Sequence, residues 1–150
     1  MDIYLTKIAE DLHEIRVVRR DGSSESHPLD SRSFLRHDFA HLAVELEVPI
    51  RLGYWGSVAA GASLSGTDLA GGDMALAESL AGPVQTLMRK EAGAEQYLSM
   101  LVRNLPDLAS AELAARIRER ARQLTGHWRA TPYGREMQIR WPDWDEENSR

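Results

Sequence analysis

The chain has 150 residues, 43% of them hydrophobic, and a net charge of −5, which fits one folded domain with its own core. It contains no cysteine, so disulfides, cysteine-ligated zinc, iron–sulfur clusters and thiol catalysis are excluded. The acidic balance argues against nucleic acid as a partner. The first residues lack a signal peptide and no apolar run reaches membrane-spanning length, so we expect a cytoplasmic protein with no membrane contact.

The first third of the sequence predicts β-strands. Residues 3–8 form a short candidate strand, and residues 14–20 are rich in β-branched side chains. Asp21-Gly22 follows as a hairpin turn, because both residues tolerate positive φ. Residues 23–29 would return as the second strand of the hairpin, and Pro28 indicates that this strand lies at an edge of the sheet.

A helix is predicted over residues 31–47, with Ser31 or Ser33 as its cap and its end before Pro49. Its apolar side chains recur at helical spacing and form one stripe: Leu35, Phe39, Leu42 and Leu46. A different face, roughly opposite, carries His37, His41 and Glu45. Valines flank that second face, so we expect a cleft or a partner to cover it.

The rest of the chain predicts mostly helices. We expect a short helix at 55–62, followed by a loop at 63–72. Asp73 would cap a helix that runs to about residue 90, with a kink or split at Gly82-Pro83. A further helix is expected at 94–104. Ser110 would cap a long helix, and residues 136–141 would form a last strand. The predicted fold class is α+β: a small N-terminal antiparallel sheet, which the C-terminal strand can join, packed with four to five helices. Residues 1–142 form the single domain and 143–150 an acidic, frayed tail.

The pattern His37-Asp38-x-x-His41 carries the chemistry. Side chains four residues apart on a helix have Cβ atoms about 6 Å apart, so two imidazoles can bind one zinc or another divalent transition metal. In the related H-E-x-x-H pattern the second residue is a base that polarises metal-bound water. Asp38 is the candidate catalytic residue here. It is one methylene shorter than glutamate and reaches about 1 Å less far, which makes it a weaker candidate for the base, because a general base must lie within hydrogen-bond reach of its proton.

A third metal ligand is needed. Glu45 continues the histidine face and is the first candidate, either as a ligand or as a hydrogen-bond partner of His41. Further candidates have no diagnostic spacing: Asp68, Asp73, Glu78 and His127. A second chain of a homo-oligomer could also supply the ligand.

Two segments together resemble an uncharacterised family of small bacterial proteins. They are the H-D-x-x-H-x-x-V-E pattern from His37 to Glu45 and the later G-x-W-G-x-V-A-A-G-A pattern from Gly53 to Ala62. The resemblance covers about the first 65 residues and implies no activity. The five-residue pattern is also similar to the zinc site of zincin metallopeptidases, although Asp38 replaces the glutamate and no downstream signature supplies a third ligand.

These observations lead to two hypotheses. The first is a metal-binding protein, such as a zinc-dependent hydrolase of an unidentified small molecule or peptide. The second is a non-catalytic ligand-binding or protein-interaction module with a histidine-lined helix face. The sequence does not decide whether the protein is an enzyme. An arginine-rich stretch at 116–122 predicts a solvated, salt-bridged face, with a phosphate or nucleic-acid patch as the alternative.

Overall fold

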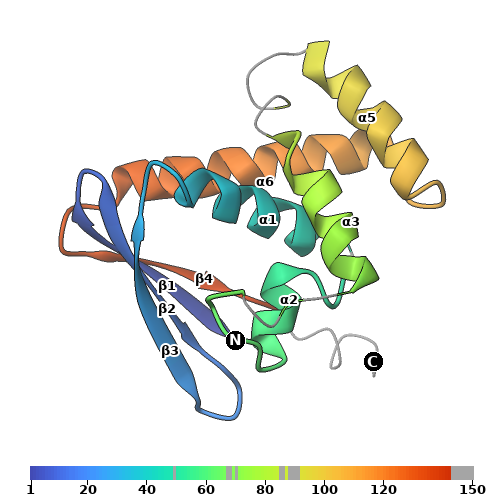
Figure 1. Ribbon diagram of the computed structural model, residues 1–150. Helices are drawn as coiled ribbons and strands as arrows, with labels where there is room; N and C mark the ends of the chain where they lie inside the picture. Colours follow the sequence, from blue (N-terminus) through green and yellow to red (C-terminus); the bar gives the residue numbers. More distant parts are fainter. Residues whose placement is uncertain (49, 67–68, 70, 85–86, 88–91, 143–150) are drawn as a thin grey trace.

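The computed structural model describes residues 1–48, 50–66, 69, 71–84, 87 and 92–142. Four antiparallel strands form one sheet in the order β3-β2-β1-β4 (Figure 1). Their bounds are Asp2–Ala9 for β1, Leu12–Val18 for β2, Ser24–Asp30 for β3 and Glu136–Arg140 for β4. The C-terminal strand thus joins the N-terminal sheet beside β1, as the sequence allowed.

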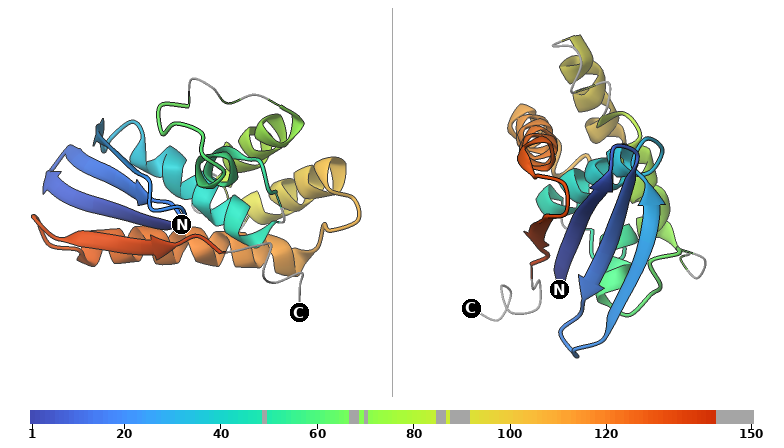
Figure 2. Two further views of the ribbon diagram at one scale, coloured as in Figure 1. Left: turned by 90° about the horizontal axis from the view of Figure 1, so that it is seen from below. Right: turned by 90° about the vertical axis from the view of Figure 1, so that its left-hand side faces the viewer.

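One face of the sheet is covered by helices and the other is open (Figure 2). The covered face carries buried side chains at every second position of β1, β2 and β4: Ile3, Leu5, Ile15, Val17, Met137 and Ile139. The pairing aligns them, since Ile3 lies opposite both Val17 and Ile139. This alternation is what a half-buried antiparallel sheet requires, and it fixes the register against the helices.

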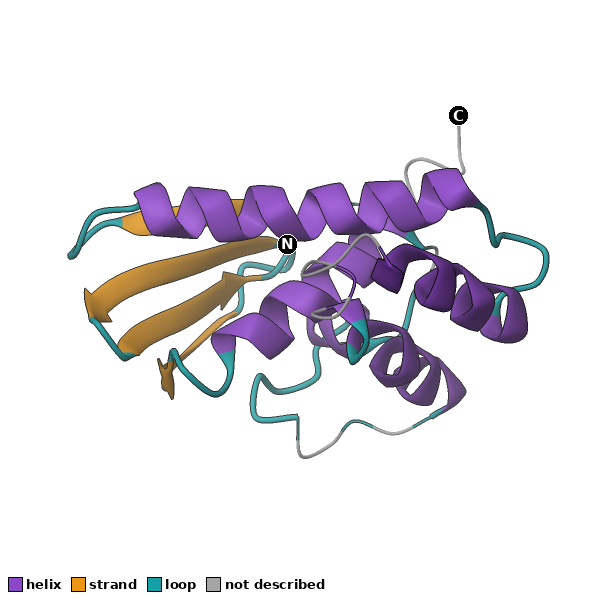
Figure 3. Ribbon diagram, turned by 90° about the horizontal axis from the view of Figure 1, so that it is seen from above, coloured by secondary structure: helices purple, strands orange, loops and turns teal. Residues whose placement is uncertain are grey.

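Five helices lie in the described part of the chain: α1 (Leu35–Glu47), α2 (Tyr54–Ala59), α3 (Gly72–Ala81), α5 (Ala92–Asn104) and α6 (Ala111–Ala130). Helices α1 and α6 pack against each other along the sheet, α3 packs on α1, and α5 packs on α6 (Figure 3). The predicted α+β class, the sheet with its added C-terminal strand and the helix count are therefore confirmed. No helix among the described residues is both long enough and apolar enough to cross a bilayer.

The predicted helix caps were right once and wrong twice. Ser110 Oγ accepts a hydrogen bond from the Leu113 N–H at 3.0 Å and caps α6. Helix α1 starts at Leu35 with Phe34 at the N-cap position, so neither Ser31 nor Ser33 is its cap and no side chain caps it. Ser31 Oγ instead contacts the buried ring of His13 at 3.0 Å. Helix α3 also lacks a side-chain cap, and the Asp73 carboxylate accepts the N–H of Leu52 instead.

The predicted break at Gly82-Pro83 is confirmed, since α3 ends at Ala81 with Gly82 as its C-cap. The acidic tail at 143–150 lies outside the described residues.

Candidate metal centre

The part of the histidine face that carries His41 and Glu45 is buried beneath the short helix α2 and beside α3, whereas His37 at its N-terminal end is exposed. Both of these helices pack on α1, and they leave His41 only 1% exposed and Glu45 fully buried. The sequence predicted that a cleft or a partner would cover this face. For His41 and Glu45 the cover comes from the chain itself, because α2 and α3 both pack back on α1.

Three side chains lie close enough together to hold one metal ion: His37, His41 and Glu78. One ligand atom from each lies within 4.8 Å of the others. Glu78 bridges the two rings, with Oε2 3.4 Å from His37 Nε2 and Oε1 3.3 Å from His41 Nε2. Neighbouring ligands on a tetrahedral zinc lie about 3.3 Å apart, given Zn–N bonds of about 2.0–2.1 Å. The carboxylate is therefore already at a ligand's distance from each imidazole.

Glu45 lies at the other nitrogen of His41. Its Oε1 is 3.0 Å from His41 Nδ1, and because an ionised carboxylate only accepts hydrogen bonds, Nδ1 carries the proton. The remaining ring nitrogen, Nε2, faces Glu78 and carries a free lone pair in the neutral form of the ring. In the described part of the chain, this buried atom has no hydrogen-bond partner, because its approach to Glu78 does not have hydrogen-bond geometry.

The same carboxylate also forms the N-terminal cap of α2. It accepts the backbone N–H groups of Tyr54 at 3.0 Å, Trp55 at 2.9 Å and Gly56 at 3.3 Å. These are donors that a helix leaves unpaired at its start. A single buried glutamate thus ties the second helix to the first and orients the imidazole between them.

The charges around His41 favour its protonated form. Burial opposes a charge on the ring, but the hydrogen bond and charge of Glu45, with the charge of Glu78, outweigh burial and raise the pKa of His41. A metal cation at Nε2 would replace that proton and would meet the same two carboxylates.

Asp38 is buried on the same helix, next to His37. Burial raises the pKa of its carboxyl to about 7, although the nearby His41 lowers it. Its Oδ2 has no hydrogen-bond partner within the described residues. A carboxyl that is desolvated and titrates near neutral pH has the properties of a general acid or base.

His37, Asp38 and Glu78 open onto one cavity of about 690 Å³. Strand β3 and the chain after α2 form much of its wall. Most of the other residues that line the cavity are apolar or aromatic, and the full apolar and aromatic set is Ile15, Pro28, Leu29, Phe34, Tyr54, Leu64, Leu69 and Met74. The Tyr54 hydroxyl is held by the Leu64 carbonyl oxygen at 2.8 Å. A mostly apolar cavity with a few convergent polar groups is typical of a small-molecule site.

Close packing explains why glycine stands at both ends of the Gly53-Tyr54-Trp55-Gly56 segment. A Cβ on Gly53 would lie 2.6 Å from the carboxyl carbon of Glu45, and a Cβ on Gly56 would overlap the carbonyl oxygen of Arg51. Both positions therefore need glycine so that the backbone can approach the buried carboxylate and the turn before α2.

The predicted residues are partly brought together. His37 and His41 meet as expected. Of the four weaker third-ligand candidates, Glu78 joins them, Asp73 binds the Leu52 amide, His127 lies exposed on α6, and Asp68 falls outside the described residues. Glu45 contacts His41 but is not among the three clustered ligands. No spacing rule in the sequence singles out Glu78, since it comes from a separate helix.

Comparison with models of protein families, with curated proteins and with solved structures finds no match to this chain. The resemblance to a small bacterial family therefore stays a prediction.

Proposed function

We propose that the protein binds a divalent transition metal, zinc in the first instance, through His37, His41 and Glu78. The observation that carries the proposal is the buried Nε2 of His41, which has no hydrogen-bond partner among the described residues while Glu45 holds Nδ1. Carboxylate–histidine–metal relays of this kind fix the ring and raise its basicity. Two imidazoles and one carboxylate form a ligand set that zinc hydrolases use, with the fourth position open to water.

The proposed activity is metal-dependent hydrolysis in the cavity beside His37. A metal ion lowers the pKa of its bound water to about 7. Asp38 would accept the proton of that water, because its own pKa of about 7 matches the task. The mostly apolar cavity wall suits a small molecule or a peptide side chain. We keep a cytoplasmic location as part of the proposal.

Metal binding is tested by calorimetric titration of Zn²⁺ into tag-free protein that has been treated with chelator. We expect one zinc per chain, with binding lost in His37→Ala and Glu78→Gln. His127→Ala is the matched control, because it removes another exposed helical histidine outside the cluster. Absence of zinc binding at micromolar protein, or equal binding by His37→Ala, would overturn the proposal.

Hydrolysis is tested separately, on p-nitrophenyl acetate with zinc-loaded protein. We expect turnover that disappears with chelator and in Asp38→Asn, while the asparagine variant still binds zinc. If zinc binds but turnover is absent or unchanged in Asp38→Asn, the metal site stands and the catalytic role of Asp38 is wrong.

A non-catalytic ligand-binding module is the second candidate. The size of the cavity and its apolar wall favour it, together with the half-exposed ring of Phe34 at the cavity. It predicts that an apolar ligand binds equally well with and without zinc, whereas the hydrolase proposal requires the metal next to the ligand.

A further inference from the structure

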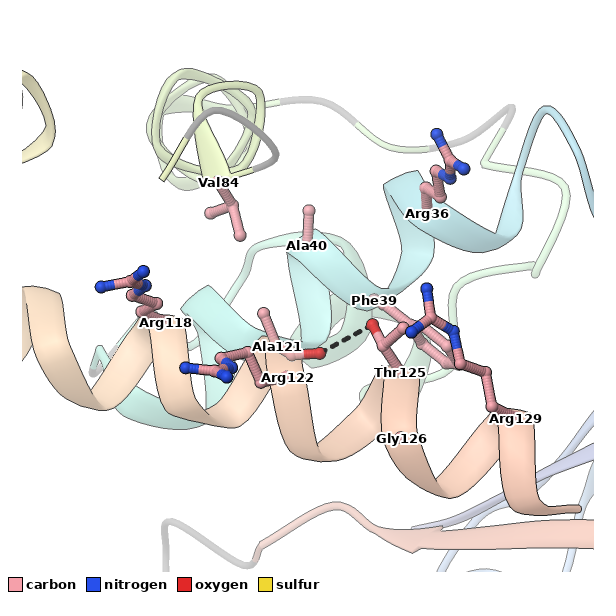
Figure 4. A pocket seen from close by; sticks show the side chains of 10 residues that line it. All are labelled: Arg36, Phe39, Ala40, Val84, Arg118, Ala121, Arg122, Thr125, Gly126 and Arg129. Atoms are coloured by element: carbon pink, nitrogen blue, oxygen red, sulfur yellow. Dashed lines mark hydrogen bonds between the residues drawn. The ribbon is translucent and has the colours of Figure 1, made fainter. Parts of the chain in front are cut away.

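A second cavity, of about 490 Å³, lies between α1, α6 and the chain just after α3 (Figure 4). None of the residues that line it lines the cavity beside His37. Its floor and sides include Phe39, Ala40, Val84 and Ala121. The Thr125 hydroxyl also faces it and donates its proton to the Ala121 carbonyl at 2.8 Å. We call this cavity the arginine cleft.

Four guanidinium groups border the arginine cleft: Arg36, Arg118, Arg122 and Arg129. The first comes from α1 and the other three from α6. In Figure 4, Arg118 and Arg122 lie toward one end of the cleft, and Arg36 and Arg129 toward the other. No aspartate or glutamate is among the described residues that line it. Four cations around a hollow without a carboxylate create a strong positive potential there.

The arginines of α6 divide into two groups. Arg116 and Arg120 bind the Glu47 carboxylate of α1, with N–O distances of 3.2 Å and 2.8 Å. These ion pairs join α6 to α1. Arg118 and Arg122 form no ion pair with any carboxylate in the described ranges. The buried Nε of Arg118 has no hydrogen-bond partner there either, and such a donor usually has a partner in a folded protein.

A neighbouring cavity between α5 and α6 does not offer the same chemistry. It also touches Arg118 and Arg122, but Glu95 and Glu119 line it as well. Those carboxylates would repel an anion, so the arginine cleft is the better location. Arginine binds carboxylates and phosphates through paired N–H groups, and it stacks on flat apolar groups.

We propose that the arginine cleft binds a small organic anion, with a phosphate, sulfonate or carboxylate on Arg118 and Arg122 and an apolar body against Phe39, Ala40 and Ala121. This site is independent of the metal centre. It differs from a nucleic-acid surface, because the charges border a hollow with apolar walls and the chain as a whole is acidic.

The test uses 8-anilino-1-naphthalenesulfonate, which combines a sulfonate with an apolar ring system, and follows its fluorescence on titration with folded protein. We expect Arg118→Gln and Arg122→Gln each to weaken binding roughly tenfold, as loss of a hydrogen bond to a charged group predicts. Arg116→Gln and Arg120→Gln are matched controls on the same helix, and each should change the affinity less than about twofold. Circular dichroism and melting temperature confirm that each variant is folded.

The uncharged analogue N-phenyl-1-naphthylamine separates charge from apolar contact. Its affinity should be unchanged in Arg118→Gln and Arg122→Gln. Equal loss of sulfonate binding in the control variants, no loss in the cleft variants, or equal loss for the uncharged analogue would each overturn the proposal. Displacement of the dye by a short single-stranded RNA, but not by millimolar inorganic pyrophosphate, would overturn it in favour of a nucleic-acid surface.

Discussion

Glu45 and His41 form a hydrogen-bonded pair at 3.0 Å in which neither side chain reaches solvent. The pair matters beyond the imidazole, because the same carboxylate satisfies three backbone N–H groups at the start of α2. Two helices and one candidate ligand therefore depend on a single side chain.

Glu45→Ala should lower the free energy of unfolding by about 3–5 kcal/mol, because it leaves buried donors without an acceptor. Glu45→Gln keeps one oxygen and should cost less. Urea unfolding measures both. Glu95→Ala, at an exposed helical glutamate, is the control, with an expected change within about 0.5 kcal/mol. A loss below about 1 kcal/mol for Glu45→Ala would contradict the role given to this carboxylate.

The two glycines before and within α2 should differ in their tolerance of alanine. Gly56→Ala should be the more damaging, because the added methyl meets the backbone carbonyl of Arg51, which cannot turn away. Gly53→Ala meets the Glu45 carboxyl at 2.6 Å, which can shift only by weakening its hydrogen bonds. We expect about 1–3 kcal/mol for Gly53→Ala and more for Gly56→Ala, measured by thermal unfolding.

Gly126→Ala is the control for these glycine substitutions, since nothing lies within 4 Å of its Cβ position and alanine favours a helix. It should leave the protein equally or slightly more stable. The prediction fails if Gly56→Ala melts at the temperature of the unmodified protein.

The lowered pKa of Glu25 predicts that the stability of the fold depends on pH. Hydrogen bonds from Ser63, His27, the Leu64 N–H and Arg19 outweigh partial burial and lower the pKa of Glu25 from 4.5 to about 2. A carboxyl whose pKa is lower in the folded than in the unfolded state stabilises the fold at pH values above its unfolded-state pKa. This contribution is lost as the pH falls from about 4.5 to about 2. Glu25→Gln should therefore be less stable than the parent at pH 6, and the difference should shrink through that window.

Denaturant unfolding at several pH values between 2 and 7 measures the effect. The exposed Glu10→Gln serves as control and should track the parent at every pH. A difference between the parent and Glu25→Gln that is the same at pH 6 and pH 3 would show that the charge of Glu25 is not what stabilises the loop after α2.

Lys7 should stabilise the end of α6. Its ammonium donates to the carbonyl oxygens of Trp128 and Thr131, each at 2.6 Å, and lies 4.8 Å from the centre of the Trp128 ring. A cation at a helix C-terminus meets the negative end of the helix dipole. Lys7→Met keeps the aliphatic stem and should cost about 1–2 kcal/mol in urea unfolding.

Arg103→Met is the matched control for Lys7, because Arg103 is an exposed cation in the last turn of α5. It should cost less than about 0.5 kcal/mol. Equal losses in the two variants would mean that Lys7 acts only as a general helix-end charge.

Local patterns predicted the elements well where the signal was short-range. The Asp21-Gly22 turn, the alternation along β2, the Ser110 cap and the break at Gly82 all depend on neighbouring residues. The cap predictions for α1 and α3 failed because Ser31 and Asp73 found partners distant in sequence, His13 and Leu52. A hydrogen bond to a remote group competes with a local cap, and the sequence carries no record of that competition.

That His37, His41 and Glu45 share one helix face follows from helical spacing alone. Which carboxylate contacts which nitrogen of His41 depends on how α2 and α3 pack on α1. Glu78 reaches the two imidazoles from α3, while Glu45 is turned to the far side of His41 by three N–H groups of α2. Tertiary packing also distinguishes the arginines of α6, since Glu47 of α1 forms ion pairs with Arg116 and Arg120 but not with Arg118 or Arg122. These assignments depend on how helices pack, which spacing along one helix cannot encode.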